Sequence, residues 1–209
     1  MPRKVLTIAD LEGVASGAEI TIAADTLITP LAREEAERRR ITLRIAEAAP
    51  GQDEPARRGV VAIGADHGGY ELKEQLKRYL REWSYTVLDL GTDSTAAVDY
   101  PDFAEAVANA VARGQAWRGV VIDSAGIGSA IAANKVPGVR AALCYDRATA
   151  RNSREHNDAN LLSLGARTIP PELAREILAV WLDTPFAGGR HQRRVDKISA
   201  IEARFLRPG

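Results

Sequence analysis

The chain has few or none of several features, and each shortage excludes a class of protein. Only one of its 209 residues is a cysteine, Cys144, which excludes an intrachain disulfide and a zinc site built on cysteines. No apolar run approaches the length of a membrane span, and the first residues lack the apolar core of a signal peptide. We therefore expect a cytoplasmic protein that makes no contact with membranes.

An excess of charge of one sign is also missing. Lys+Arg and Asp+Glu number 28 each, so the overall charge does not favour binding to nucleic acid or to an anionic membrane. The length allows one sizeable core and an appendage. Cys144 follows the largely apolar segment 139–143, which indicates a small buried hydrophobic residue rather than a reactive thiol.

The first 58 residues differ from the rest. Their expected elements are strands at 5–7, 20–22 and 41–45, and a helix that begins at Pro30 behind a Thr29 cap. A linker rich in proline and charge follows at 46–59. Residues 1–58 are therefore assigned to a small α+β extension, which is too small for a catalytic core and acts either in docking or as a structural cap.

From residue 59 to residue 209, apolar strands alternate with helical patterns. The strands are expected at 60–63, 85–90, 120–122, 139–144 and 161–164. Five strands joined by helices predict an α/β domain, a Rossmann-like doubly wound sheet of about five parallel strands with right-handed crossovers.

The run 119–135 is the first candidate for chemistry. Asp123 stands where an apolar strand ends, and Ser124 and a Gly-Ile-Gly turn (Gly126, Ile127, Gly128) lead into a helical pattern. A strand, a glycine-rich turn and a helix in this order direct free backbone N–H groups at an anion. The alternative is an ordinary turn that uses glycine for tight packing.

Two further loops follow strands of the predicted sheet. Asp66 and His67 come directly after the first strand and precede two glycines, a pattern that suits a sugar hydroxyl and a phosphate. The alternative is a capping Asp beside a surface His. Tyr100, which precedes Pro101, follows the second strand; its hydroxyl could face the same edge, although a packed tyrosine is the simpler interpretation.

Histidine and arginine complete the set of candidates. His156 could act as a general acid or base, and Asn157 offers an amide N–H to an oxyanion. Arg190 and Arg194 are four residues apart and would share a helix face, which suits a phosphate, and Arg167 after the fifth strand could join them. The alternatives are a histidine stabilised by a helix dipole and a solvated basic face.

Residues 60 to about 206 resemble the family of ribose-5-phosphate isomerase type B and galactose-6-phosphate isomerase subunits. The resemblance covers about 147 of the 209 positions and rests on six blocks in the family's order: 64–69, 98–101, 126–128 with 131–135, 156–160, 164–167 and 188–194.

The resemblance implies a metal-free aldose–ketose isomerase without a cofactor, active as a homodimer or dimer of dimers with sites shared across an interface. It assigns ring opening to His156 and sugar contacts to Asp66 and Tyr100. The substrate-binding positions that it implies also include Ser124 and Asn134, and the N–H groups of Gly126, Ile127 and Gly128, with Asn157, would stabilise an enediolate. It assigns the phosphate to His67, Arg167, Arg190 and Arg194.

One departure from the family concerns the catalytic base. The usual cysteine is replaced by Asp123, the hydroxyl residue two positions on is Ala125, and Ser129 stands where another branch has a glutamate. We predict that Asp123 acts as the base. The alternative is a catalytically silent or re-purposed homologue that still binds a sugar phosphate.

The segment 22–33 lies outside the isomerase family. It is similar to a short segment in enzymes associated with bacterial microcompartments, and the similarity is much weaker than that of the isomerase blocks. The hypothesis is that residues 1–58 recruit the enzyme to a compartment shell or to another cargo enzyme. An extra oligomerisation or capping element is an equal alternative.

Overall fold

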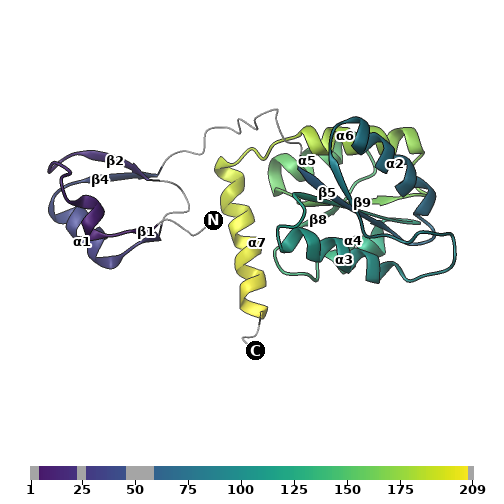
Figure 1. Ribbon diagram of the computed structural model, residues 1–209, viewed down its shortest axis with the longest axis horizontal. Helices are drawn as coiled ribbons and strands as arrows, with labels where there is room; N and C mark the ends of the chain where they lie inside the picture. Colours follow the sequence, from purple (N-terminus) through teal and green to yellow (C-terminus); the bar gives the residue numbers. More distant parts are fainter. Residues whose placement is uncertain (1–4, 23–26, 46–58, 207–209) are drawn as a thin grey trace. The chain divides into compact units, whose positions relative to one another are not determined.

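The computed structural model describes residues 5–22, 27–45 and 59–206 (Figure 1). The chain divides into two units, Met1–Glu54 and Pro55–Gly209, and each has a core of its own. The linker expected at 46–59 lies, except for Gly59, outside the described residues.

The smaller unit combines two parallel strand pairs with one helix. Its elements are β1 (Val5–Leu6), the 3-10 helix η1 (Ile8–Leu11), β2 (Glu19–Ile22), β3 (Leu27–Ile28), α1 (Pro30–Arg38) and β4 (Thr42–Ile45). β1 pairs with β3 and β2 pairs with β4. The expected cap is present, because the backbone N–H of Ala32 donates to Thr29 Oγ1 at 3.3 Å. Leu11, Ala32, Ala36 and Ile41 form the buried core.

The larger unit is a five-stranded parallel sheet in the order β6-β5-β7-β9-β8. Its elements are β5 (Val60–Ala65), α2 (Tyr70–Glu82), β6 (Thr86–Asp89), α3 (Tyr100–Ala112), β7 (Arg118–Asp123), α4 (Ile127–Ala133), β8 (Ala141–Leu143), α5 (Arg147–Asn157), β9 (Leu161–Gly165), α6 (Pro171–Asp183), the 3-10 helix η2 (Gly189–His191) and α7 (Gln192–Phe205). The doubly wound α/β architecture expected from the alternating pattern is confirmed.

The central strands are mostly apolar because both faces of the sheet are covered. Val61 and Ile63 enter a core that α2, α5 and α6 complete, whereas Ala62, between them, enters a second core beneath α3 and α4. Figure 1 shows these two helical layers on opposite sides of the sheet. The sheet is therefore rigid, and its loops are the parts free to hold a ligand.

Helix α7 lies outside both layers (Figure 1). Only Val195 is buried, and the apolar side chains of Ile198, Ile201 and Phe205 are exposed. The Glu202 carboxylate fixes the far end of α7, because both of its oxygens lie 3.0 Å from the backbone N–H donor of Gly138. None of the helices in the described part of the chain is long and apolar enough to cross a membrane.

Candidate active site

The order of the strands creates a switch point between the loops that follow β5 and β7. The chain leaves β5 for β6 on one side and then crosses to β7 on the other, so the two loops diverge at the carboxyl ends of neighbouring strands. Such switch points are where open α/β sheets bind ligands. Ala65 pairs with Ile122, which brings the following residues, Asp66 and Asp123, to the same edge.

The turn after β7 is held in one shape by hydrogen bonds. The Asp123 carboxylate accepts the backbone N–H groups of Ala125 at 2.8 Å, of Gly126, and of Ser129 at 2.9 Å. Gly126 has a φ of 79°, a backbone conformation that favours glycine. The Ser163 hydroxyl donates to the Gly126 carbonyl at 2.6 Å and fixes the turn to β9.

Two neighbouring N–H groups of the same turn remain available. Among the described residues, no acceptor lies within hydrogen-bond distance of the backbone N–H groups of Ile127 or Gly128. Gly128 also lies close to Tyr100, since a Cβ atom at this position would come 2.9 Å from the tyrosine Oη. The N–H donors and the phenol hydroxyl therefore line the same part of the edge.

The loop after β5 contributes Asp66 and His67. The Asp66 side chain is 7% exposed, and its Oδ1 accepts the Gly69 N–H at 3.0 Å. Nδ1 of His67 lies 3.1 Å from the carbonyl oxygen and 3.2 Å from the nitrogen of Val98, so its tautomer decides which bond forms. The imidazole thereby ties the β5 loop to the loop that carries Tyr100.

The β5 and β7 loops also touch directly. A Cβ atom on Gly68 would lie 2.5 Å from Ser124 Oγ and 3.3 Å from Asp66 Oδ1, so only a glycine allows this approach. Arg167 joins the edge through its backbone N–H, which donates to the Ser124 carbonyl at 2.9 Å. We call this set the carboxyl-edge group; its members are Asp66, His67, Tyr100, Asp123, Ser124, Gly126, Ile127, Gly128 and Arg167.

The remaining candidates lie at the other end of the sheet. His156 and Asn157 end α5, which runs against the strands and leads into the amino end of β9. A five-residue parallel strand spans about 16 Å, so this distance separates them from the carboxyl-edge group. We call His156, Asn157, Arg190, His191 and Arg194 the amino-edge group.

His191 is a member of this group to which the sequence analysis gave no role. Its ring stacks on His156 with centroids 4.2 Å apart and planes 6° from parallel, and the side chain is 7% exposed. Burial, and then the charges of His156 and the neighbouring arginines, lower the pKa of His191 below its ordinary value. His191 could have been found from the sequence, because it lies in block 188–194 of the family resemblance.

Ion pairs hold the loop that follows His156. The buried Arg154 donates to Asp158 Oδ1 at 2.8 Å and to the Ala159 carbonyl at 2.7 Å. Arg140 donates to Asp158 Oδ2 at 2.9 Å. Asp158 has a φ of 46°, and these two guanidinium groups stabilise it in that conformation. Asp158 and Ala159 therefore have a structural role in holding this loop.

The structure corrects one expectation about the amino-edge group and shows how Asn134 is bonded. Arg190 and Arg194 do not share a helix, because Arg190 lies in η2 and α7 begins only at Gln192. The reason is that Gly188 and Gly189 both have positive φ, which turns the chain before the helix. Asn134 bridges α4 to β8, since its side chain bonds the Ala130 and Ala141 backbone and both of its polar atoms are used.

The hydrogen bonds of Asp123 bear on its predicted role as the base. A base that removes a proton from carbon needs a free lone pair at close range. Both oxygens of Asp123 already accept hydrogen bonds from its own turn, and the side chain is 5% exposed. These contacts argue against the role of base and favour a role in holding the turn.

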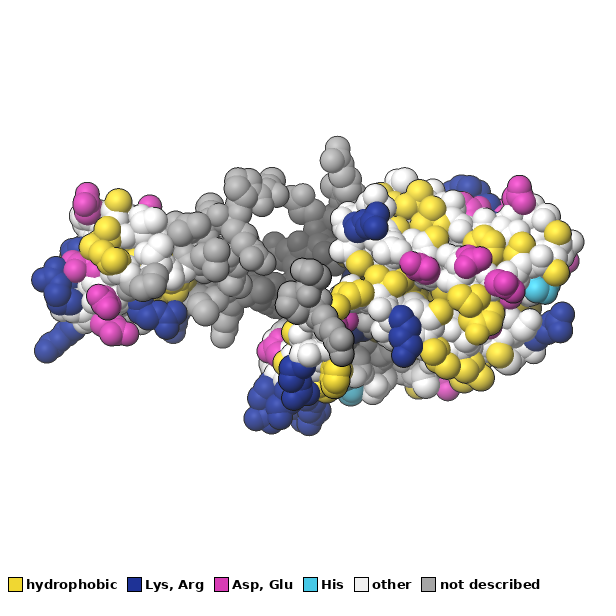
Figure 2. All heavy atoms as spheres, turned by 90° about the horizontal axis from the view of Figure 1, so that it is seen from below, with side chains coloured by type: hydrophobic (Ala, Val, Ile, Leu, Met, Phe, Trp, Pro, Cys, Tyr) yellow, Lys and Arg dark blue, Asp and Glu magenta, His cyan; other side chains and the backbone are white. Residues whose placement is uncertain are grey.

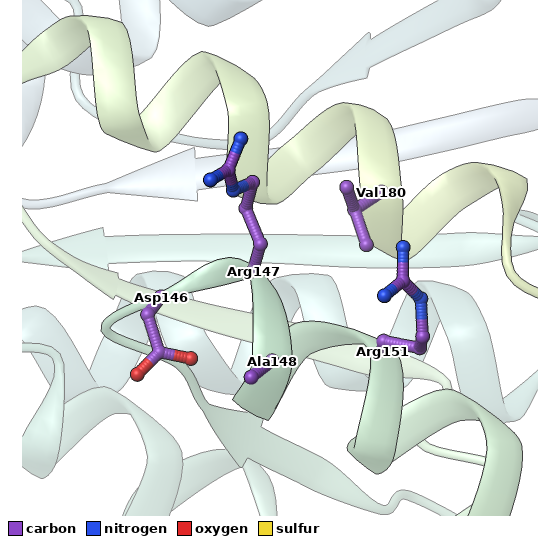
Figure 3. Close-up of a pocket in the computed structure, with 5 residues that line it drawn as sticks. All are labelled: Asp146, Arg147, Ala148, Arg151 and Val180. Carbon is purple, nitrogen blue, oxygen red and sulfur yellow. The ribbon is translucent and has the colours of Figure 1, made fainter.

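Two hollows of the larger unit lie away from the carboxyl-edge group. One, of about 510 Å³, lies between α5 and α6; Figure 3 shows Arg147 and Arg151 on one side of α5 with Val180 opposite. Arg147 pairs there with Glu176 at 3.4 Å. The other is a groove of about 710 Å³ between α7 and the segment 134–142. Among the described residues, no group of three or more His, Cys, Asp or Glu side chains could hold a metal ion.

Comparison with known proteins gives one consistent result. Residues 61–198 match the family described as Ribose/Galactose Isomerase. The chain is 48% identical to a putative sugar phosphate isomerase, YwlF, of Bacillus subtilis and 45% identical to ribose-5-phosphate isomerase B of Escherichia coli. These matches cover 70% and 69% of this chain and 99% and 97% of the relatives.

A solved structure extends the likeness to three dimensions. Ribose-5-phosphate isomerase B of Clostridium thermocellum is 51% identical to this chain and superimposes with a TM-score of 0.69. The match covers 70% of this chain and 99% of the other. The smaller unit therefore falls outside these matches.

Proposed function

Because this chain belongs to the ribose/galactose isomerase family, and is thereby a sugar-phosphate isomerase, we propose that it interconverts ribose 5-phosphate and ribulose 5-phosphate or a closely similar pair. The observation that carries the proposal is the carboxyl-edge group. A carboxylate, a phenol and free N–H donors lie together at the switch point of the sheet.

The chemistry requires a base and a stabilised oxyanion. The base takes the proton from C2 of the open-chain aldose, the electrons of the C–H bond form the C1–C2 double bond, and O1 becomes anionic. The N–H groups of Ile127 and Gly128 are suited to this oxygen, because fixed donors stabilise charge that develops in the transition state. Return of the proton to C1, with the O2 proton passing to O1, gives the ketose.

The identity of the base determines whether the protein converts its ligand. The sequence predicts Asp123, whose oxygens are engaged by three backbone donors. This engagement favours one alternative function, a homologue that binds a sugar phosphate without converting it. Binding without any exchange of substrate hydrogen would identify such a protein.

A complete site would take residues from two chains. In one chain the carboxyl-edge group and the amino-edge group lie at opposite ends of the sheet. A phosphate bound by Arg190 and Arg194 is therefore out of reach of a sugar beside Asp66 of the same chain. We propose that the amino-edge group of one copy completes the carboxyl-edge group of another, as a homodimer or dimer of dimers.

An apolar surface is available for such an assembly. Ile127 and Ile131 lie one turn apart on α4 and are 51% and 58% exposed. Figure 2, which views the larger unit from the α3–α4 side, shows apolar side chains over this face. The groove beside α7 adds Ile198, Ile201 and Phe205. A second copy is the proposed occupant, since burying these side chains is favourable.

The test is hydrogen exchange with solvent. The protein is incubated in D₂O with ribose 5-phosphate and, separately, with allose and galactose 6-phosphates, and C1 and C2 deuteration is followed by NMR. Incorporation of deuterium together with ketose formation supports the isomerase. Tight binding without exchange of any substrate supports the silent alternative.

For the smaller unit we propose a docking role toward a compartment shell or another cargo enzyme. Its separate core supports the proposal, as does the exposure of Leu31 on α1, which is 62%. Deletion of residues 1–58 should leave the isomerase activity and change the localisation. Unchanged localisation with full activity rejects the docking role, and a changed oligomeric state would instead indicate an assembly element.

A further inference from the structure

Two carboxylates end neighbouring strands at the switch point, but they are hydrogen-bonded differently. Asp66 and Asp123 follow the paired residues Ala65 and Ile122, and both side chains are almost buried. Asp123 accepts three backbone N–H groups, whereas Asp66 accepts one. Both residues are aspartates at the ends of neighbouring strands, but Asp66 has more capacity left to accept a further hydrogen bond than Asp123.

The bonds of Asp123 all come from its own turn. Oδ1 accepts from Ala125 and Gly126, and Oδ2 accepts from Ser129. These bonds close the turn on itself and leave Ile127 and Gly128 as its outward donors. Protonating this carboxylate during catalysis would break the bonds that shape the turn.

Asp66 has an oxygen to spare. Its Oδ1 accepts from Gly69, and no donor of the described residues lies within hydrogen-bond distance of Oδ2. This oxygen is not among the buried polar atoms that lack a partner, so it is open to a ligand. A carboxylate with one anchored oxygen and one open oxygen meets the geometric requirement of a general base.

The contacts around Asp66 connect its loop to the loops that follow β6 and β7. Its Oδ1 and the Ser124 hydroxyl both lie against Gly68, and the neighbouring His67 is bonded to Val98. The segment from Val98 leads to Tyr100, which packs on Gly128. The β5, β6 and β7 loops are therefore connected to one another, and both Asp66 and the Gly128 turn belong to this connected set.

We propose that Asp66 is the base that transfers the proton between C2 and C1, and that Asp123 is a positioning residue that shapes the donor turn. This inference rests on the isomerase function proposed above. Asp66 Oδ2 takes the C2 proton, the C–H electron pair forms the C1–C2 double bond, and the carbonyl pair moves to O1. The carboxylic acid then returns the proton to C1, and the O2 proton moves to O1.

The experiment compares Asp66→Asn with Asp123→Asn in the full chain. Loss of a general base lowers rates by about 10² to 10⁴. We expect Asp66→Asn to lose kcat and deuterium exchange by this factor with KM within about threefold. Asp123→Asn should keep the exchange and lower kcat/KM about tenfold through a weakened turn. Asp93→Asn, an exposed carboxylate in the loop after β6, is the matched control and should behave as wild type.

Two readouts separate a base from a structural residue. The acid limb of the kcat/KM profile against pH should disappear in Asp66→Asn and persist in Asp123→Asn. Formate should restore part of the exchange in Asp66→Ala, because it can enter the vacated space as a carboxylate base, and should not restore it in Asp123→Ala. Melting temperatures identify any variant that has lost its fold.

The outcomes are distinct. Asp66→Asn that exchanges within tenfold of wild type overturns the inference. Asp123→Asn that melts like wild type but neither exchanges nor keeps the acid limb also overturns it and supports Asp123 as the base. If wild type exchanges none of the tested sugar phosphates, the isomerase function fails instead, whatever the variants do.

Discussion

The two ends of the sheet present different chemical groups. At the carboxyl edge, backbone N–H groups and close glycine contacts do most of the shaping, and one carboxylate is used to fix a turn. At the amino edge, imidazole and guanidinium side chains are presented, and arginine–aspartate pairs stabilise the loop behind them. The difference fits the proposed division of labour, in which one end handles the reacting carbons and the other a phosphate.

The largest effect is expected at Gly126. Gly126→Ala puts a side chain at a φ of 79° and a Cβ 2.5 Å from Leu143 Cδ1 and 2.8 Å from the Leu164 carbonyl carbon. Strain and overpacking should lower the free energy of unfolding by about 3 kcal/mol or more. Thermal unfolding and the isomerase assay measure the loss of stability and of activity.

Gly114→Ala is the matched control for that substitution. Gly114 has a φ of 70°, but a Cβ there would meet nothing within 4 Å. Only the backbone strain remains, about 1 kcal/mol. Equal losses in the two variants would mean that the packing around the β7 turn is looser than the structure indicates.

Mixing variants of the two edges tests whether one site uses two chains. Asp66→Asn and Arg194→Ala should each be nearly inactive alone. After unfolding and refolding together, half of the dimers contain one of each chain, and one of their two sites is intact, so about a quarter of wild-type activity should return. Recovery absent in mixed dimers verified by mass would place both edges of one chain in the same site.

These results also show how far the sequence could lead. The apolar runs were sufficient to predict the parallel sheet, since strands that are buried on both faces have no alternating polar side. Because helices between parallel strands return to the amino edge, the position of His156 follows from the alternation alone. The hydrogen bonds of Asp123 could not be predicted in this way, because they depend on the left-handed backbone conformation of Gly126. The prediction that Arg190 and Arg194 share a helix was wrong for a similar reason, because Gly188 and Gly189 have positive φ.

A smaller effect is expected for stability against pH. The folded pKa of His191 lies below the ordinary 6.5, so the unfolded chain binds more protons as the pH falls through that range. The contribution of His191 to stability is thus present above pH 6.5 and is lost on acidification. His191→Phe keeps a ring for stacking and removes the titration. Its melting temperature should therefore fall less than that of wild type between pH 7.5 and 5.5.

The smallest effect is expected at the single cysteine. Burial raises the pKa of the Cys144 thiol to about 11, so almost no thiolate is present at neutral pH. A thiol reagent such as Ellman's reagent should leave native protein unmodified at pH 8 and react fully in denaturant. Rapid labelling of the native chain would instead show that the thiol is more accessible than its 1% exposure indicates.

The groove beside α7 has a practical consequence. It lies at the far end of the sheet from the carboxyl-edge group, and Ile198, Ile201 and Phe205 border it. If a second copy docks there as proposed, a small apolar compound bound in the groove would hinder that docking without resembling any carbohydrate. Such an inhibitor would act non-competitively, and raising the protein concentration, not the substrate concentration, would overcome it.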